Sequence, residues 1–203
     1  METPMKRILM VGAMLALSSP ALAAGYTTGD AVADMQVTDS NGVVHNLNDF
    51  AGKTVVLEWT NDGCPYVKKH YNTDNMQTLQ KEAAADDVVW LSVISSAPGK
   101  QGHVDGAGAN ALTAERGAAP AAVILDEAGE AGRTFAAKTT PHMYIIDADQ
   151  TLVYQGAIDD NPSSNPATVE TATNYVRKAL MEVKAGQPVT DATTQPYGCS
   201  VKY

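Results

Sequence analysis

One short segment constrains the fold of this chain more than any other. Residues 54–60 form a run of β-branched and apolar side chains with the length of a strand. Turn-forming residues at 61–63 end this run, and Cys64 and Pro65 follow directly. Because proline suits the first position of a helix, where its missing N–H is no loss, we expect a helix to begin at Pro65 with Cys64 near its N-cap. The segment therefore predicts a strand that delivers a cysteine to the start of a helix.

Strand-like and helix-like patterns alternate along the rest of the chain. An Asn-Gly pair at 41–42 predicts a hairpin between residues 32–37 and 43–47. This order of elements predicts an α/β fold, a sandwich with a mixed central sheet, flanking helices and an N-terminal β-hairpin. Further strands are expected at 88–94, 121–125, 143–146 and 152–155, and short helices at 109–116 and 130–136. The helix from Pro65 is expected to kink at 72–74, and a last helix to open at 165–166 and to end at Gly186.

The two ends of the chain differ in composition from this central domain, which we place at residues 24–186. Lys6 and Arg7 precede an apolar run, and small residues follow it up to Ala23, the pattern of a secretory signal peptide at residues 1–23. The run is shorter than the roughly 20 residues that cross a bilayer, and no cysteine follows it for a lipid anchor. We expect an exported protein, periplasmic or secreted, without a membrane anchor. Residues 187–203 are expected to form a polar C-terminal tail.

Charge and cysteine content exclude several classes of partner. The chain has 14 Lys and Arg against 23 Asp and Glu, a net charge of −9, whereas nucleic-acid surfaces need clustered basic residues. Nucleic acid is therefore not expected as a partner. The two cysteines, Cys64 and Cys199, are too few for a disulfide scaffold or a four-thiolate zinc site. No cofactor and no metal are predicted.

Cys64 is the residue with the strongest signal for chemistry. The unpaired N–H groups and the dipole at a helix N-terminus favour a negative charge, and the thiolate is the reactive form of cysteine. Lys68 lies one helical turn further on, where its ammonium is expected to help hold the thiolate. The alternative is that Cys64 is simply a small buried hydrophobic residue.

The sequence around Cys64 resembles a known superfamily. Residues 57–67 are similar to the active-site stretch of thioredoxin-like proteins, and most similar to the redoxin or alkyl-hydroperoxide-reductase/thiol-specific-antioxidant branch, which is peroxiredoxin-like. Thr140 and Pro141 resemble the cis-proline loop that faces the active cysteine in that superfamily. The resemblance covers residues 27–185. It implies a thioredoxin-like fold, a thiol-dependent oxidoreductase and a docking surface shaped by Pro141.

The chain also departs from the patterns of that superfamily. Val67 stands where a thioredoxin-type site has its second cysteine. Leu57 and Asn61 stand where a peroxiredoxin site usually has proline and a hydroxyl residue. Arg116 and Arg133 are the only stand-ins for an arginine that polarises a peroxide. These departures leave disulfide exchange and peroxide reduction both open.

Cys199 is the candidate resolving cysteine, although its polar tail shows no helix or strand pattern to hold it. Pairing with Cys64 within one chain, pairing between chains and no pairing at all remain open. The first hypothesis is an exported thiol-redox protein, in which Cys64 attacks a protein disulfide or a peroxide, Cys199 resolves the product and an unidentified reductant restores the thiols. The second is a non-catalytic binding module with the same fold and a structural Cys64–Cys199 disulfide.

Three further polar residues are given structural interpretations. His70 is rotated about 240° around the helix from Cys64 and is expected to be a partly buried polar tip. His142 follows the predicted cis-proline and is expected near the site, either as a packing residue or in a functional role. Asp159, after the last strand, is interpreted as part of a solvated turn. Copper binding by Cys64 and the two histidines resembles the copper-chaperone branch of the superfamily, but the second helix cysteine used there is absent.

Overall fold

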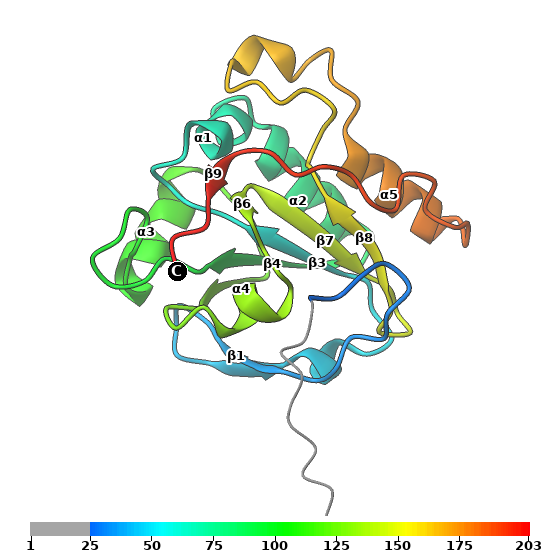
Figure 1. The fold of residues 1–203 in the computed structure, drawn as a ribbon, viewed down its shortest axis with the longest axis horizontal. Coiled ribbons are helices and arrows are strands. Elements are labelled where there is room, and N and C mark those ends of the chain that lie inside the picture. The colour runs from blue at the N-terminus through cyan, green and yellow to red at the C-terminus, as the bar shows by residue number, and fades with distance from the viewer. Residues whose placement is uncertain (1–24) are drawn as a thin grey trace, which may run out of the picture.

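The centre of the molecule is a mixed five-stranded sheet with the strand order β5-β4-β3-β7-β8 (Figure 1). The computed structural model describes residues 25–203, and the signal peptide predicted for residues 1–23 lies outside them. Strands β3, β4 and β5 are parallel, whereas β7 runs antiparallel to β3 and β8 antiparallel to β7. The strand bounds are Val55–Trp59 for β3, Val89–Ile94 for β4, Ala122–Leu125 for β5, His142–Ile146 for β7 and Leu152–Gly156 for β8. The expected α/β architecture with a mixed sheet is confirmed.

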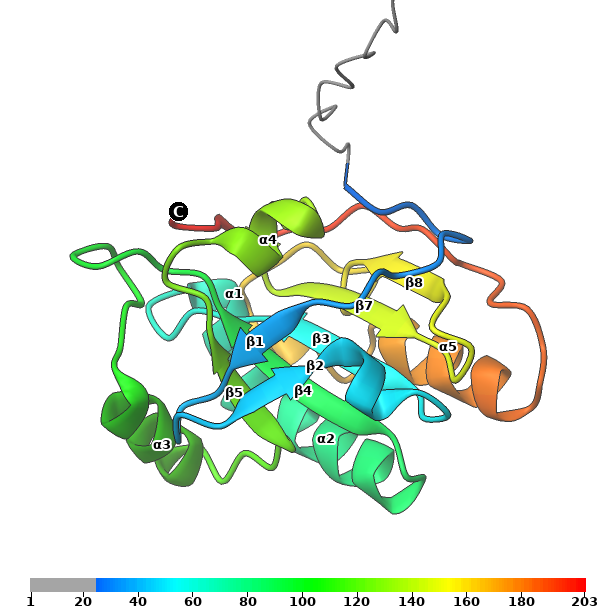
Figure 2. The ribbon, with the colours of Figure 1, turned by 90° about the horizontal axis from the view of Figure 1, so that it is seen from below.

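Different elements cover the two faces of the sheet. On one face lie the predicted N-terminal hairpin, formed by β1 (Gln36–Thr38) and β2 (Val44–Asn46), and the short helix α4 (Glu130–Thr134) (Figure 2). On the other face pack α1 (Pro65–Tyr71), α2 (Asn75–Ala85) and α5 (Tyr175–Lys184). Helix α3 (Gly106–Glu115) packs beside β5. All five strands of the sheet are therefore shielded from solvent along most of their length.

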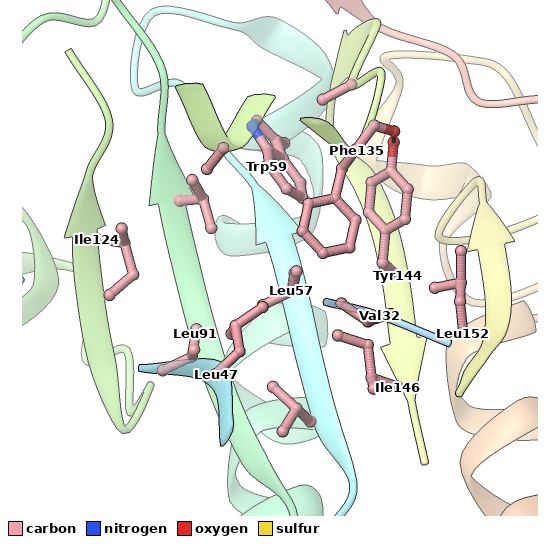
Figure 3. Close-up of a cluster of buried hydrophobic side chains, with 14 residues drawn as sticks. Val32, Leu47, Leu57, Trp59, Leu91, Ile124, Phe135, Tyr144, Ile146 and Leu152 are labelled. Carbon is pink, nitrogen blue, oxygen red and sulfur yellow. Dashed lines mark hydrogen bonds between the residues drawn. The ribbon is translucent and has the colours of Figure 1, made fainter. Parts of the chain in front are cut away.

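An aromatic cluster fixes the end of β3 on the hairpin side of the sheet (Figure 3). The ring centroid of Trp59, the last residue of β3, lies 5.6 Å from that of Phe135 and 5.0 Å from that of Tyr144. The indole N–H of Trp59 donates a hydrogen bond of 2.9 Å to the Ser95 hydroxyl, so the polar atom of its ring has a partner. Because Trp59 is completely buried, the turn that follows it starts from a fixed point.

Helix boundaries differ most from the sequence prediction in two places. The expected kink after Pro65 is a full break, since α1 ends at Tyr71 and α2 begins at Asn75 after Asp74 in the left-handed region with φ of 55°. The last helix begins at Tyr175 and not at residues 165–166, where only a 3₁₀ turn, η2 (Pro166–Thr168), forms. Asn174 caps α5 by accepting a hydrogen bond from the Arg177 N–H. Among residues 25–203, no helix has the length and apolar character needed to cross a membrane.

The C-terminal tail is part of the fold, which corrects the expectation that no element holds it. Residues 199–200 form the short strand β9 (Cys199–Ser200), which pairs antiparallel with β6 (Thr139–Thr140). Val201 packs against the core on the hairpin side. The Tyr203 hydroxyl donates to the Ala137 carbonyl at 2.9 Å, and its ring lies 4.9 Å from the Arg133 guanidinium. Two-residue strands and single anchor side chains leave no periodicity in a sequence.

We predict that Tyr203→Ala destabilises the protein by about 1–2 kcal/mol, because it removes a part-buried ring, its stacked guanidinium and one hydrogen bond. Urea unfolding followed by tryptophan fluorescence measures the difference. Met181→Ala is the control, since the Met181 side chain on α5 is 66% exposed and its loss is expected to change stability by less than about 0.5 kcal/mol. Equal effects of the two substitutions would show that the tail contributes nothing to the fold.

Candidate functional site

The turn after β3 places Cys64 at the N-cap of α1, as the sequence predicts. Cys64 has extended backbone angles, with φ of −85° and ψ of 121°, and Pro65 occupies the first helical position. The Asn61 side chain accepts a hydrogen bond of 2.8 Å from the Gly63 N–H, and its carbonyl accepts one of 3.1 Å from the Cys64 N–H. Asn61, which replaces the hydroxyl of a peroxiredoxin site, therefore shapes the turn that carries the cysteine.

Two other segments meet Cys64 at this point. The Thr140–Pro141 peptide bond is cis, as the resemblance implied, and the Cys64 thiol donates a hydrogen bond of 3.0 Å to the Thr140 carbonyl oxygen. In the β6–β9 ladder Thr140 pairs with Cys199. The structure thus brings together three of the predicted site residues, Cys64, Pro141 and Cys199, and both cysteines are free thiols.

The two thiols have pKa values shifted in opposite directions. The pKa of the Cys64 thiol is lowered as the net result of two opposing effects. Burial raises this pKa. Hydrogen bonding to the sulfur, by the side chains of Cys199 and Thr140 and by backbone groups of Val67 and Cys199, lowers it by more. The contribution of Val67, in the first turn of α1, is the expected effect of a helix N-terminus. Burial, the hydrogen bond to Cys64 and the Cys64 charge raise the pKa of Cys199 to about 11. As the pH rises, the pair therefore ionises first at Cys64.

We predict two separate thiolate titrations in the reduced protein, the first below and the second above the pKa of a free cysteine, about 8.5. Cys199→Ala removes a donor to Cys64 and is expected to raise the pKa of the remaining thiol. Ultraviolet absorbance of the thiolate, followed as a function of pH, measures both values. An unchanged Cys64 titration in Cys199→Ala would contradict the coupling between the two thiols.

Lys68 and its neighbour Lys69 in α1 differ in exposure to solvent. Lys68 is exposed and, among the described residues, forms no hydrogen bond or ion pair with Cys64. Its role in holding the thiolate stays a prediction. Lys69 is completely buried, and its ammonium lies 3.2 Å from the Asp159 carboxylate and donates a hydrogen bond of 3.0 Å to the Asn161 carbonyl.

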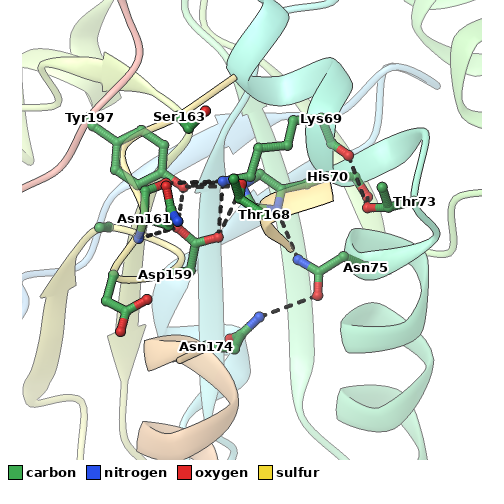
Figure 4. A network of polar contacts seen from close by, with 12 residues as sticks. Lys69, His70, Thr73, Asn75, Asp159, Asn161, Ser163, Thr168, Asn174 and Tyr197 are labelled. Carbon is green, nitrogen blue, oxygen red and sulfur yellow. Dashed lines mark hydrogen bonds and ion pairs between the residues drawn. The ribbon is translucent and has the colours of Figure 1, made fainter. Parts of the chain in front are cut away.

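Lys69 and Asp159 belong to a buried polar cluster that the sequence analysis missed (Figure 4). Tyr197, two residues before Cys199, donates its hydroxyl proton to Asp159 and receives a hydrogen bond of 3.2 Å from Lys69. His70 Nε2 lies 3.3 Å from the same hydroxyl. The interpretation of Asp159 as a solvated turn is wrong, since it is 2% exposed, and His70 is fully rather than partly buried. The ion pair with Asp159 offsets the cost of burying the Lys69 side chain.

His142 is a packing residue in β7 with a defined hydrogen-bonding role. Its Nδ1 accepts a hydrogen bond of 3.3 Å from the Lys138 N–H and lies 3.0 Å from the Tyr144 hydroxyl. Burial and, to a smaller extent, the nearby Lys138 charge lower the pKa of His142 to about 3, so the ring is neutral at physiological pH. His70 is also neutral, because burial lowers its pKa to about 4 against the opposing effect of Asp159.

We predict that the free energy of unfolding falls as the pH drops from about 6.5 toward 3. In this window the unfolded chain binds protons at histidines that the folded protein keeps neutral, so acid favours unfolding. His142→Asn keeps an acceptor near the position of Nδ1 but does not titrate, and it is expected to remove roughly 4 kcal/mol of this pH dependence. Urea unfolding from pH 3.5 to 7.5 compares the two proteins. Parallel stability curves would contradict the burial of a neutral His142.

Glu58, in the middle of β3, is a second buried group that the sequence analysis did not single out. It accepts hydrogen bonds from the side chains of Tyr71, Gln80, Trp90 and Ser92, at 2.8, 3.2, 2.8 and 3.0 Å. Burial raises the pKa of Glu58 despite these donors. An acidic residue within an otherwise apolar strand was the available signal. Its hydrogen bonds tie β3 to α1, α2 and β4 directly below the turn that carries Cys64.

The two arginines considered as peroxide-polarising groups are engaged elsewhere. Arg116 forms an ion pair with Asp62, and its guanidinium lies 4.4 Å from the centre of the Tyr71 ring. Arg133 stacks on Tyr203 at the end of the tail. Among residues 25–203, no group of three or more His, Cys, Asp and Glu side chains is arranged to hold a metal ion. The two histidines use ring nitrogens in the separate hydrogen-bond networks described above.

Comparisons with known proteins identify the family and the fold. A family model described as Redoxin matches residues 27–174. An uncharacterized conserved protein from Geobacillus kaustophilus has a similar structure, with a TM-score of 0.76, 24% identity and coverage of 89% of this chain and 94% of that chain. A hypothetical protein from Sinorhizobium meliloti gives a TM-score of 0.73 and 20% identity, with 88% and 96% covered.

A third similar structure is a thioredoxin domain. The thioredoxin domain of a thiol-disulfide oxidoreductase from Bacteroides vulgatus gives a TM-score of 0.51 and 18% identity, with 72% of this chain and 98% of that chain covered. At these identities the similarity shows the fold alone, and it confirms the thioredoxin-like fold class. A search of curated proteins found no match to the chain.

Proposed function

Since the chain belongs to the Redoxin family, we propose that it is an exported thiol–disulfide oxidoreductase with Cys64 as the nucleophile and Cys199 as the resolving cysteine. The observation that carries the proposal is the pair itself. A thiol with a lowered pKa at a helix N-cap donates a hydrogen bond to the residue with which Cys199, a thiol with a raised pKa, is paired. Export, expected from the signal-peptide pattern at residues 1–23, would allow a disulfide between them to persist.

The reaction begins at the Cys64 thiolate. It attacks one sulfur of a substrate disulfide, the substrate S–S bond breaks, and the other substrate sulfur leaves as a thiolate that takes a proton. Cys64 is then joined to the substrate in a mixed disulfide. Attack by Cys199 on the Cys64 sulfur forms the Cys64–Cys199 disulfide and releases the second substrate thiol. The two electrons gained by the substrate come from the cysteine pair. An external dithiol then reduces the Cys64–Cys199 disulfide back to two thiols and is itself oxidised.

The coupling between the thiols gives these two steps an order. The negative charge on Cys64 is one of the causes that raise the pKa of Cys199. Once Cys64 is held in a mixed disulfide, that charge is gone and the pKa of Cys199 falls. Cys199 therefore stays protonated while Cys64 is the nucleophile and becomes easier to ionise when its own attack is required.

Disulfide exchange is favoured over peroxide reduction by the surroundings of Cys64. Cleavage of a peroxide bond is helped by a cationic donor that stabilises the leaving oxygen. Arg116 and Arg133 are bound to Asp62 and to Tyr203, as described above, and Lys68 is exposed to solvent. The substrate proposed here is accordingly a protein disulfide.

One observation favours a second function, a non-catalytic binding module in which the cysteine pair only fixes the tail. The Cys64 side chain is 0% exposed, so no substrate reaches it in this conformation. The two functions differ in the reactivity of the pair, because a structural disulfide resists exchange with small thiols.

We predict that Cys199→Ser accumulates a Cys64 mixed disulfide when the reduced protein is mixed with oxidised glutathione, because the second step has lost its nucleophile. The wild-type protein is expected to pass on to the Cys64–Cys199 disulfide and to release both glutathione molecules. Cys64→Ser is the matched control. Its remaining thiol, Cys199, keeps the effect of burial on its pKa but loses the two effects of Cys64, and it is expected to form a mixed disulfide more slowly than Cys64 does in Cys199→Ser. Intact mass spectrometry of quenched samples distinguishes the three products.

A parallel reaction with hydrogen peroxide tests the chemistry of the substrate. Oxidation of Cys64 to a sulfenic acid faster than exchange with glutathione disulfide would move the assignment to a peroxidase. Wild-type protein that reacts with neither reagent would contradict the enzyme and support the binding module.

A further inference from the structure

The last eight residues, 196–203, form a segment that covers Cys64 and that we name the strap. Figure 1 shows it crossing the molecule past α1 and along β6 to the C-terminus. Within it, β9 pairs with β6 at the residue whose carbonyl accepts the hydrogen bond from Cys64. Cys64 is 0% exposed, whereas the strap residue Cys199 is only partly buried. The strap therefore lies between Cys64 and solvent.

Separate anchors along the strap hold it in place. At its start, Tyr197 enters the buried cluster of Lys69, His70 and Asp159 (Figure 4). Further on, the Val201 N–H donates a hydrogen bond of 3.1 Å to the Lys138 carbonyl, and the Lys202 carbonyl accepts one of 2.9 Å from the Ala97 N–H. Between these anchors the strap is held by the two-residue pairing of β9 with β6. A few local contacts of this kind open at a lower free-energy cost than the core of the sheet.

We propose that the strap is an autoinhibitory gate, which leaves β6 before any protein partner reaches Cys64, and that the hydroxyl of Tyr197 in the Lys69–Asp159 cluster is its latch. The proposal rests on the proposed function in one respect, that the partner brings a disulfide to Cys64. It adds an order of events, because Cys199 lies on the strap. Opening exposes Cys64 for attack and removes Cys199 from it, and closing returns Cys199 for the resolving step.

Gly198 offers a substitution that opens the gate without removing a side chain. Its φ is +138°, and a Cβ at this position would collide with the carbonyl group of Thr140 on β6. Gly198→Ala is therefore expected to push β9 away from β6. Gly42 in the β1–β2 hairpin is the matched control, since its φ is +77° and nothing lies within 4 Å of a Cβ there. Gly42→Ala also places a side chain at a positive φ, but far from the strap and without a steric collision.

The test measures alkylation of Cys64 as the single thiol in a Cys199→Ser background. Limiting second-order rate constants from rate–pH profiles, with iodoacetamide and with a bulky maleimide, separate accessibility from the pKa of the thiol. Gly198→Ala is expected to raise both rate constants by about tenfold or more, the effect expected of backbone strain at such a position, and Gly42→Ala to leave them within about twofold. Tyr197→Phe keeps the ring, removes the latch hydroxyl and is expected to accelerate alkylation to a smaller extent.

Hydrogen exchange identifies which part of the protein opens. Faster exchange in residues 196–203 of Gly198→Ala, with β3 and β4 unchanged, supports local opening of the strap. The gate is overturned if Gly198→Ala and Tyr197→Phe have the same alkylation rate constants as the Cys199→Ser background. If Gly198→Ala does not fold, the rate constant of Tyr197→Phe decides the question by itself. Alkylation does not depend on enzymatic turnover, so the two proposals can fail separately. If the substitutions accelerate alkylation but the protein does not exchange with oxidised glutathione, only the proposed function is refuted. If the protein exchanges but the substitutions leave alkylation unchanged, only the gating role of the strap is refuted.

Discussion

The structure around the site depends on one junction, the hydrogen bond of the Cys64 thiol to the Thr140 carbonyl with Cys199 paired to the same residue. It joins three segments that are far apart in the chain, the turn after β3, the cis-proline loop and the C-terminal strap. Each of these segments is held in place by its own contacts. Trp59 fixes the end of β3 in the aromatic cluster, and Tyr197 and Tyr203 fix the two ends of the strap. The close approach of the cysteines follows from these separate restraints.

Electrostatics then gives the two chemically identical thiols different pKa values, which suit the different roles that we propose for them. Cys64 has backbone and side-chain donors directed at its sulfur, whereas the burial of Cys199 beside a thiolate keeps its proton on. The difference disappears when Cys64 forms a covalent bond, because the charge that separated the two pKa values is then lost. A site with only two cysteines can in this way keep nucleophile and resolving group distinct without the second helix cysteine, which is Val67 here.

Local sequence signals predicted the fold and the N-cap position of Cys64, because each depends on neighbouring residues. The strand, turn and Pro65 determine the N-cap position of Cys64, and the family resemblance found in residues 57–67 is confirmed by the family model over residues 27–174. Features formed by distant residues were missed. Asp159 lies far along the chain from Lys69, so the ion pair that allows both to be buried has no local pattern. The strap was missed for the same reason, since β9 acquires its structure only by pairing with β6.

The most direct test of the central claim is the redox potential of the two cysteines in the protein without residues 1–23, measured by alkylation and mass spectrometry across a glutathione series. The account predicts a Cys64–Cys199 disulfide within one chain that exchanges with glutathione at a potential above about −300 mV. A disulfide that stays closed well below that potential would make the pair structural. Two thiols that never pair would contradict the resolving role of Cys199.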